Sequence, residues 1–229
     1  MDLKVLYEDN HLIAVYKPAG VLVQSDKTGD STLMDEVKYY LKQRYHKTGQ
    51  VFLGLIHRLD RPAQGIILFA KTSKGASRLS EQFREHKVEK IYHALVVGKP
   101  PKSKEGLVHF LEKDGNKNRT TVHGLPTTGA SRAELSYEVI KTNGKFSLLK
   151  IILGTGRSHQ IRAQLAYIGC PIVGDVKYGA PASPRTSAGS QTHHVLELAA
   201  TELSFTTAIG DEEKHISVEV PAEWVKLAS

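Results

Sequence analysis

The sequence predicts an α+β fold in which about three helices pack on a mostly antiparallel sheet. Three observations lead to this prediction. Apolar or alternating runs of strand length recur along the chain, and Gly, Pro and Asn residues divide them. Only three segments space their apolar residues as an amphipathic helix does. In addition, 40% of the 229 residues are hydrophobic, which provides a sizeable core and excludes general disorder.

The first half of the chain alternates strands with two helices. Thr32 and Asp35 have the spacing of a capping box, and they precede an amphipathic helix over 33–46. Ser73 is the expected N-cap of a second helix that ends near His86. Strands are predicted for the apolar runs 12–18, 65–71 and 91–98, and the run 51–60 is apolar before it becomes abruptly charged.

The second half is richer in strands and contains one short helix. Residues 156–158 open this helix, and Gly169 followed by Pro171 stops it. Residues 179–193 are poor in large apolar groups, so we expect a mobile surface loop there. The remaining strands are expected at 106–112, 119–124, 133–140 and 146–153, near 194–206, and at 215–220.

Composition limits the class of protein. The chain shows no repeat and no linker, so we expect a single domain over 1–229. The only cysteine, Cys170, excludes a disulfide framework and fits a reducing compartment. The N-terminus lacks the layout of a signal peptide, and no apolar run approaches the roughly 18 residues that span a bilayer. These features predict a soluble, cytoplasmic protein that acts away from membranes, by default a monomer without an obligate protein partner.

The formal charge of +7 is unevenly distributed along the chain. Residues 34–105 contain 15 basic and 7 acidic side chains, a net charge of +8, whereas the rest of the chain has a net charge of −1. Such a segment fits a polyanionic partner such as nucleic acid. It also fits an ordinary solvated face, and composition alone leaves both interpretations open.

Three polar clusters could carry chemistry. The segment 57–62, His-Arg-Leu-Asp-Arg-Pro, places the carboxylate of Asp60 among two arginines and a histidine, which keeps it ionised. Lys90 and Tyr92 open a strand, and the segment 155–162 opens the third helix. Each cluster also fits a structural role when it is taken alone: a salt-bridge knot, a core aromatic, an exposed helix start.

The third cluster supplies a partner for the carboxylate. Arg162 lies about one turn after Ser158, and Ile161 and Leu165 should face the core. Arg162 is then held at the rim of the core. Because a buried unpaired charge is costly, a fixed arginine partner for Asp60 is physically reasonable.

In this order, HRLD, K-x-Y at the start of a strand and GRSHQIR at the start of a helix resemble motifs of the RluA-type family of RNA pseudouridine synthases. KPAGV (17–21) and GDVKYG (174–179) support the resemblance, which therefore covers nearly the whole chain. It implies the fold of that family, a mostly antiparallel mixed sheet with flanking helices and loops.

The resemblance also implies roles for single residues. Asp60 corresponds to the catalytic aspartate, Tyr92 to the active-site tyrosine and Arg162 to the arginine that pairs with the aspartate. Arg58 corresponds to the arginine that enters the RNA helix where the target base has flipped out. The other motif residues expected to contact RNA are His57, Arg61, Lys90, Arg157 and His159.

The implied reaction isomerises specific uridines in structured tRNA or rRNA, with an aspartate nucleophile that attacks the sugar C1′ or the uracil ring. It requires extrusion of the base, at a cost of a few kcal/mol. It requires no cofactor, and the 11 histidines show no metal-ligand spacing. One alternative is an inactive RNA-binding or RNA-folding factor on the same fold. A metal-dependent nuclease fits less well, because clustered carboxylates are missing.

Two stretches depart from the family pattern. Ala63-Gln64-Gly65 (63–65) replaces Thr-Ser-Gly, and Leu198-Ala199-Ala200 (198–200) replaces Leu-His-Ala. The chain also starts almost directly at the strand before KPAGV, so we expect no auxiliary N-terminal RNA-binding domain. RNA affinity is then expected to come from the catalytic domain itself, which slightly favours tRNA over rRNA.

Overall fold

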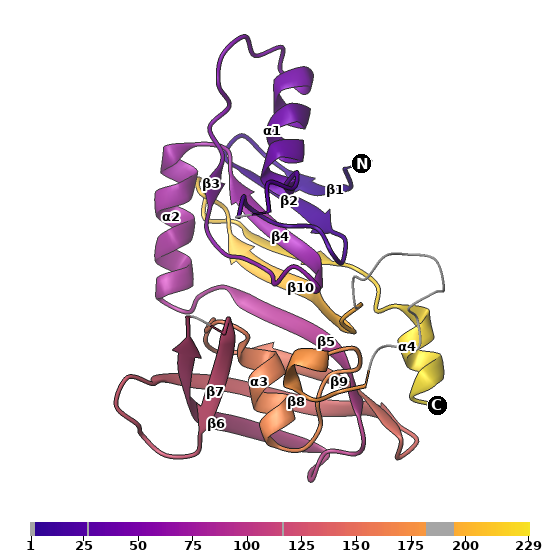
Figure 1. Ribbon diagram of the computed structural model, residues 1–229. Coiled ribbons are helices and arrows are strands. Elements are labelled where there is room, and N and C mark those ends of the chain that lie inside the picture. The colour runs from indigo at the N-terminus through magenta and orange to yellow at the C-terminus, as the bar shows by residue number, and fades with distance from the viewer. Residues whose placement is uncertain (1–2, 27, 116, 182–194) are drawn as a thin grey trace. The chain divides into compact units, whose positions relative to one another are not determined.

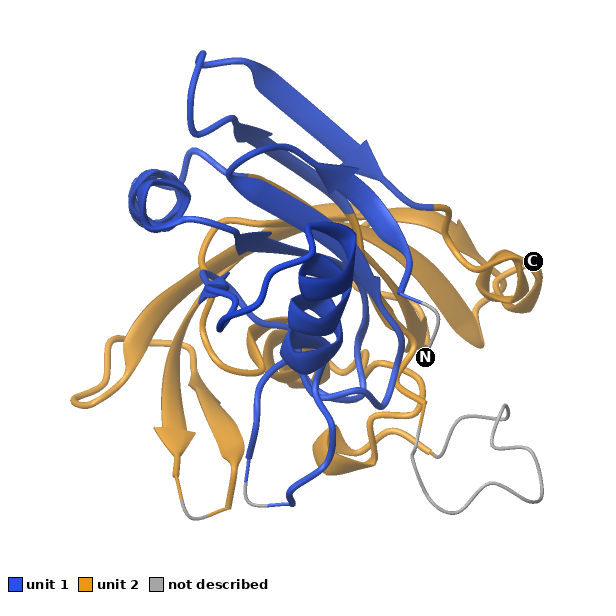
Figure 2. Cartoon of the chain, turned by 90° about the horizontal axis from the view of Figure 1, so that it is seen from above, with its two compact units in different colours: residues 1–88, 202–218 blue, residues 89–201, 219–229 orange. Residues whose placement is uncertain are grey.

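The computed structural model describes residues 3–26, 28–115, 117–181 and 195–229. The chain forms two compact units (Figures 1 and 2). Unit 1 consists of residues 1–88 and 202–218, and unit 2 of residues 89–201 and 219–229. The single domain predicted from the sequence stays a prediction.

Unit 1 is built on a mostly antiparallel sheet, as predicted. β2 pairs antiparallel with β1 and with β4, β3 is a second partner of β4, and β10 forms a hairpin with β11. The predicted strands 12–18 and 65–71 are therefore confirmed, β1 was not predicted, and only two residues of the run 51–60 are a strand. The strands are β1 (Val5–Glu8), β2 (Leu12–Lys17), β3 (Gly54–Leu55), β4 (Gln64–Ala70), β10 (Leu198–Thr206), which begins in unit 2, and β11 (Glu213–Ser217).

Helix α1 (Leu33–Arg44) covers one face of this sheet. The predicted capping box is present: the Asp35 N–H donates to Thr32 Oγ1 at 3.2 Å, and the Thr32 N–H donates to Asp35 Oδ2 at 3.1 Å. The helix ends two residues earlier than expected. Its buried side chains pack with alternate residues of β2 and β4, which point to one side of the sheet; the cluster includes Leu33, Val37, Leu41, Ile13, Val15, Ile67 and Phe69.

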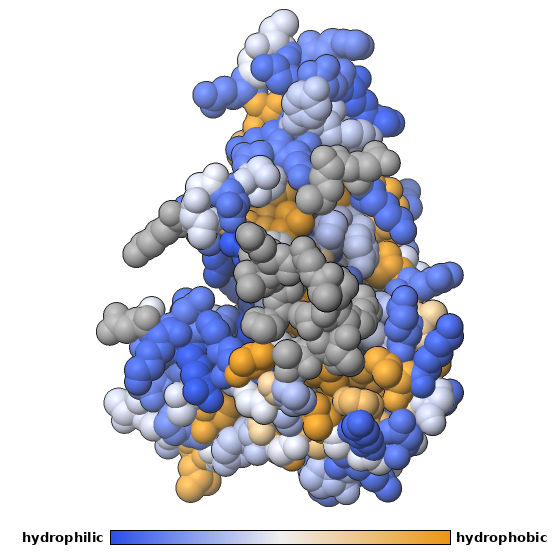
Figure 3. All heavy atoms as spheres, turned by 45° about the vertical axis from the view of Figure 1, so that its right-hand side comes forward, coloured by the Kyte–Doolittle hydropathy of each residue, from blue (hydrophilic) through white to orange (hydrophobic). Residues whose placement is uncertain are grey.

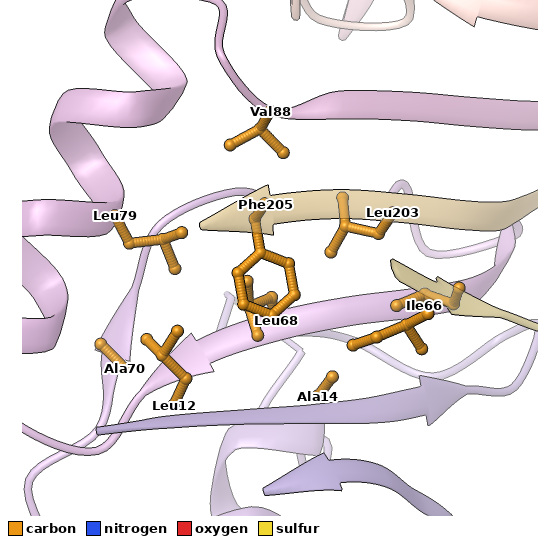
Figure 4. Packing of buried hydrophobic residues seen from close by; sticks show 10 residues of the cluster. Leu12, Ala14, Ile66, Leu68, Ala70, Leu79, Val88, Leu203 and Phe205 are labelled. Atoms are coloured by element: carbon orange, nitrogen blue, oxygen red, sulfur yellow. The ribbon is translucent and has the colours of Figure 1, made fainter. Parts of the chain in front are cut away.

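Helix α2 (Ser73–Arg84) packs with the other set of alternate residues. Its N-cap is Thr72 rather than the predicted Ser73, because Thr72 has the extended backbone of a cap and its Oγ1 accepts the Gly75 N–H at 3.1 Å. Since both faces of the β2–β4 pair are covered, these strands are continuously apolar. The second cluster includes Leu12, Ala14, Ile66, Leu68, Ala70, Leu79, Val88, Leu203 and Phe205 (Figure 4).

Unit 2 contains five antiparallel strands in the order β5-β9-β8-β6-β7. All five strands were predicted, and most extend one or two residues beyond their predicted ends. β6 and β7 pair antiparallel, and residue 116 between them lies outside the described residues. The strands are β5 (Glu89–Val97), β6 (Lys104–Asp114), β7 (Arg119–His123), β8 (Ser131–Thr142) and β9 (Phe146–Leu153).

The helices of unit 2 differ from the prediction in two ways. α3 (Gln160–Tyr167) begins after His159 rather than at 156–158, because His159 has a left-handed backbone with φ of 52°. α4 (Ala222–Leu227) was not predicted; the described residues thus form four α-helices and one 3-10 helix, η1 (Val176–Tyr178), instead of about three helices. Most of the predicted loop 179–193 lies outside the described residues.

One buried charge holds together the part of unit 1 that carries HRLD. Lys17, the last residue of β2, is fully buried. Its ammonium donates to the carbonyl oxygens of Pro18 at 3.0 Å, Val21 at 2.8 Å and Arg61 at 3.0 Å, so all three N–H groups have acceptors. Burial lowers the pKa of Lys17 to about 7, and the negative charge of Asp60 opposes this decrease. Lys17 therefore ties the KPAGV turn to the loop that contains Asp60.

We expect Lys17→Met to lower the free energy of unfolding by about 3 kcal/mol, roughly 1 kcal/mol for each buried carbonyl that loses its donor. Urea unfolding of the whole chain measures this loss. Lys74→Met on the exposed side of α2 is the matched control, with an expected change within about 0.5 kcal/mol. Equal stabilities of the two variants would show that the Lys17 contacts do not stabilise the loop.

Candidate active site

Asp60 belongs to unit 1, in the loop between β3 and β4. Its carbonyl oxygen accepts the Ala63 N–H at 3.0 Å, which closes a tight turn over the intervening residues. Leu59 is buried and anchors the loop, whereas Asp60 is partly exposed and Arg58 is exposed. The turn thus presents a carboxylate at the surface of unit 1 on a backbone that is anchored on both sides.

Arg61 fastens this turn to the KPAGV segment. Its carbonyl accepts the Gly20 N–H at 2.8 Å as well as the Lys17 ammonium, and its Nε donates to the Gly20 carbonyl at 3.0 Å. Its Nη2 forms an ion pair with Asp30 at 2.7 Å. The side chain predicted to contact RNA therefore has a structural role in unit 1.

His57 contacts other residues of unit 1, whereas its neighbour Arg58 is exposed. The His57 ring stacks on Phe83 with a centroid distance of 4.9 Å, and its Nε2 accepts the Leu68 N–H at 3.0 Å. An imidazole that accepts at Nε2 carries its proton on Nδ1, so this ring completes the backbone bonding of β4. The neighbouring Arg58 is exposed. His57 is partly exposed and engaged in the fold, whereas Arg58 is the more exposed of the two side chains.

The two departures from the family pattern are accommodated locally. Gln64 Oε1 accepts the hydroxyl of Tyr16 at 3.0 Å, which braces the start of β4 against β2. Ala199 is buried and packs in an apolar cluster of unit 2 with Leu95, Leu148 and Trp224. An alanine suits that position because a polar ring would have to be buried among apolar side chains.

Tyr92 and Lys90 lie at the start of β5 in unit 2. Tyr92 is 7% exposed and pairs with Ile151 of β9. Lys90 is also buried, and this burial lowers its pKa. The two side chains point to the same side of the strand, because residues two apart share a face. The K-x-Y motif thus places an aromatic ring and an amine with weakened basicity side by side.

Several hydrogen bonds fasten the GRSHQIR segment to β8, and the amide side chain of Gln160 joins the two. Gln160 Oε1 accepts from the Thr155 hydroxyl at 2.7 Å and from the Arg157 N–H at 3.0 Å. Its Nε2 donates to the Glu134 carbonyl at 3.0 Å. The side chain of Arg157 is exposed, and its Nε donates to the Arg132 carbonyl at 3.1 Å. The conformation at the start of α3 is therefore set by Gln160.

Arg162 is buried and forms a bidentate ion pair with Asp175. Nε and Nη2 of Arg162 donate to the two carboxylate oxygens at 2.7 and 2.8 Å. Both side chains are buried, with 7% and 1% of the side chain exposed, so the pair is strongly constrained. The guanidinium also lies 5.3 Å from the centroid of the Tyr178 ring. The orientation of Arg162 is consequently determined within unit 2.

Tyr178 connects this pair to His159. Its oxygen accepts the Thr120 N–H at 2.8 Å and lies 3.0 Å from Nδ1 of His159. Burial raises the pKa of Tyr178, so its hydroxyl keeps its proton and can donate to the imidazole. Arg119 lies over the same ring at 5.4 Å. His159, predicted to contact RNA, is thereby engaged with a buried phenol.

Sequence reasoning did not assign roles to three of these residues. Lys17 belongs to KPAGV, and Asp175 and Tyr178 belong to GDVKYG; both segments supported the resemblance without an individual function. For Lys17 and Asp175, the signal that could have identified them is a charged residue that directly follows an apolar run; Tyr178 carries no such signal. Such a charged residue has to be paired when it is buried.

The described part of the chain contains no group of three or more His, Cys, Asp or Glu side chains placed to hold a metal ion. None of its helices combines the length and apolar character needed to cross a bilayer. The two histidines 193–194 lie outside the described residues. Cys170 is buried.

The chain is similar to known RNA-modifying proteins. It is 31% identical over 238 residues to the tRNA pseudouridine synthase C of Vibrio parahaemolyticus, covering 99% of this chain and 94% of that protein. It is 29% identical over 232 residues to the ribosomal large subunit pseudouridine synthase D of Zymomonas mobilis, covering 96% and 70%. An uncharacterised RNA pseudouridine synthase of Chlorobaculum parvum is 35% identical over 207 residues, and the chain spans only 62% of its length.

The fold has solved counterparts. The human RNA pseudouridylate synthase domain containing 4 superposes with a TM-score of 0.76 at 23% identity, covering 97% of this chain and 90% of that chain. This likeness confirms the predicted fold class. The family model described as RNA pseudouridylate synthase matches residues 11–167, which include the HRLD, K-x-Y and GRSHQIR motifs. The chain therefore belongs to the family of RNA pseudouridylate synthases, enzymes that isomerise uridine in RNA to pseudouridine.

Proposed function

We propose that this RNA pseudouridine synthase uses Asp60 as its nucleophile on specific uridines in structured tRNA or rRNA. The proposal rests on the way in which hydrogen bonds hold the backbone around Asp60. The carboxylate of Asp60 is partly exposed, and the backbone carbonyl of this residue closes a turn in which the next residue is fastened by Lys17 and by Gly20. Such a carboxylate can approach a substrate without any rearrangement of its own backbone.

The reaction needs one nucleophile and moves the bond between base and ribose from one ring atom of the uracil to another. The bond from N1 of uracil to C1′ of the ribose breaks, the base rotates, and a bond from C5 to C1′ forms. The proton at C5 then leaves, and N1, which has lost its bond to the ribose, carries a proton in the product, so atoms balance and no electrons are exchanged with a cofactor. A single ionised carboxylate can form the transient covalent bond that this sequence of steps requires.

Tyr92 and Arg162 support this chemistry in the proposal. Tyr92 offers an aromatic face and a hydroxyl to the extruded uracil. By its motif, Arg162 corresponds to the arginine that pairs with the catalytic aspartate in the family. Because Asp175 occupies Nε and Nη2 of its guanidinium, the remaining N–H groups point in a set direction. Asp175 therefore acts as a positioning residue for Arg162.

RNA binding is assigned to the exposed cations of the motifs. Arg58 refills the gap left by the extruded base, and the exposed Arg157 contacts the backbone of the RNA. His57, Arg61, Lys90 and His159 act mainly by holding these segments, as their contacts and burial favour. We further propose that the enzyme works as a monomer in the cytoplasm.

We expect Asp60→Asn to abolish pseudouridine formation and to leave RNA affinity within a few-fold, because it removes a nucleophile and no basic group. Tritium release from RNA labelled at uridine C5, run beside filter binding, measures both quantities. Turnover by the variant would rule out Asp60 as the nucleophile. A wild-type chain that binds RNA and releases no tritium would instead favour a binding-only factor.

Arg58→Ala should impair turnover more on structured RNA than on an unstructured strand, because only a stacked base leaves a gap to refill. The ratio of kcat/KM on a folded transcript to that on a short single strand is the measured quantity. Arg84→Ala, which removes an exposed cation from the last turn of α2, is the control. Equal losses on both substrates would exclude the base-replacement role.

Arg162→Ala is expected to lower stability by about 3–5 kcal/mol, because it leaves the buried carboxylate of Asp175 unpaired, and to abolish turnover. The combined change Arg162→Met and Asp175→Leu should recover much of the stability without activity. Thermal unfolding and tritium release separate the two effects. A double variant with normal turnover would refute the role of Arg162.

A further inference from the structure

The end of α1 combines exposed aromatic rings with cations. Five side chains form what we call the α1 basic–aromatic surface: Lys38, Tyr39, Lys42, Tyr45 and Lys47. At 100° per residue, the first four fall within about 120° of the circumference of the helix. The core residues of α1 lie on the opposite side. Tyr39 is 67% exposed and Tyr45 46% exposed, which is unusual for rings that the fold could bury.

Cations predominate in this region, in which Glu8 is an acidic group that accepts the Tyr45 hydroxyl and pairs with Lys71 and Arg44. Residues 37–59 contain no Asp or Glu and five Lys or Arg residues. Among the described residues, the side chains of Lys38 and Lys42 form no hydrogen bond or ion pair, so the fold does not use their charges. Figure 3 shows mainly hydrophilic side chains at the end of unit 1 that carries α1. The surface is available to a polyanion.

The Tyr45 ring is held in place. Tyr45 is the C-cap of α1, and the Lys47 N–H closes the helix end on the Lys42 carbonyl at 3.0 Å. The hydroxyl of Tyr45 donates to Glu8 Oε1 at 2.7 Å. Three cations surround the ring, with Lys71 at 4.7 Å and Arg44 and Lys47 at 6.0 Å from its centroid. A fixed ring surrounded by cations loses little entropy when a flat ligand stacks on it.

We propose that the α1 basic–aromatic surface docks the RNA substrate, with an unpaired base stacked on Tyr45 and phosphates bound by Lys42 and Lys47. Aromatic rings interleaved with cations are the combination that single-stranded or looped RNA recognises. An acidic protein surface would use the cations, but unpaired RNA presents a flat base beside every phosphate, which matches rings and cations placed next to each other. The inference rests on the proposed function in one respect: the RNA that docks is the one that is modified.

The surface lies away from the Asp60 loop within unit 1. β2 and β4 pair from Leu12 with Ala70 to Lys17 with Gly65, a length of five residue steps or about 17 Å. Lys17 and Asp60 mark one end of this ladder, whereas Lys71 and the Tyr45 ring mark the other. The same strand pair therefore keeps the docking surface at Tyr45 at a constant distance from the Asp60 loop. An RNA bound at Tyr45 would be selected for a feature other than the target uridine.

Filter binding of the full chain to unmodified tRNA transcripts, at several salt concentrations, tests the proposal. Tyr45→Leu should weaken binding about 5- to 150-fold, the range for one stacked base. Tyr45→Phe keeps the ring but loses the bond to Glu8, and it should bind within about 2-fold of the wild type. Lys42→Ala with Lys47→Ala should reduce the slope of log K against log salt by about 1.4 to 1.8, as expected for two phosphates.

Lys214→Ala with Lys226→Ala is the matched control, because it removes the same charge from two positions outside α1, of which Lys214 pairs with Glu212. This control should leave the slope and the affinity unchanged. An equal loss in both double variants, or normal binding by Tyr45→Leu, overturns the proposal. Binding of the surface to phosphatidylglycerol vesicles in preference to tRNA overturns it as well.

Tritium release separates this inference from the proposed function. Tyr45→Leu should raise KM while kcat at saturating RNA stays within about 2-fold, because the ring is distant from Asp60. A lowered kcat with unchanged KM contradicts a docking role. If the wild-type chain forms no pseudouridine in any tRNA or rRNA, the proposed function fails, while the binding series still decides whether RNA docks at Tyr45.

Discussion

A buried ammonium is the constraint on which the presentation of the catalytic loop depends. Lys17 gives each of its three N–H groups to a backbone carbonyl, and those carbonyls come from two segments 40 residues apart in sequence. The segments are the KPAGV turn and the HRLD loop. Neither has regular secondary structure around these carbonyls, so neither could hold its own conformation. The cost of burying the charge is offset in part by these contacts and by the negative charge of Asp60, and the pKa of Lys17 falls to about 7 because burial outweighs them.

Unit 2 uses a second buried charge in a similar way. The guanidinium of Arg162 is held by two bonds to Asp175 and lies against the Tyr178 ring, and α3 and η1 carry these residues. Two buried charges, one in each unit, therefore orient the groups expected to act on the substrate. An enzyme whose chemistry depends on one carboxylate benefits from such rigidity, because misplacement of a reacting group by about 1 Å is costly.

The exposed charges differ in role from the buried ones, because they attract the RNA. Cations attract the phosphates of RNA, and the free energy of this attraction depends strongly on salt concentration and little on exact geometry. These cations lie on exposed parts of unit 1, such as Arg58 and the end of α1, where their side chains are solvated. Burial separates the two classes: buried charges such as Lys17 and Arg162 build the site, whereas exposed ones collect the substrate. The net charge of +8 in residues 34–105 includes mainly the second class.

The sequence alone determined the family, the strands and the main catalytic candidates. The spacing of apolar residues that marks a strand or a helix involves only residues close together in sequence. The elements β2, β4 and α1 and the strands of unit 2 could therefore be predicted from local patterns. The HRLD, K-x-Y and GRSHQIR motifs are equally local. Tertiary structure decided which charges of those motifs are buried, and no local pattern carries that information. His57, Arg61 and His159 were predicted as RNA contacts, yet their partners Leu68, Gly20 and Tyr178 lie up to 41 residues away. Asp175 likewise gained its role only when η1 folded beside α3, because an ion pair across 13 residues depends on the chain's path in space.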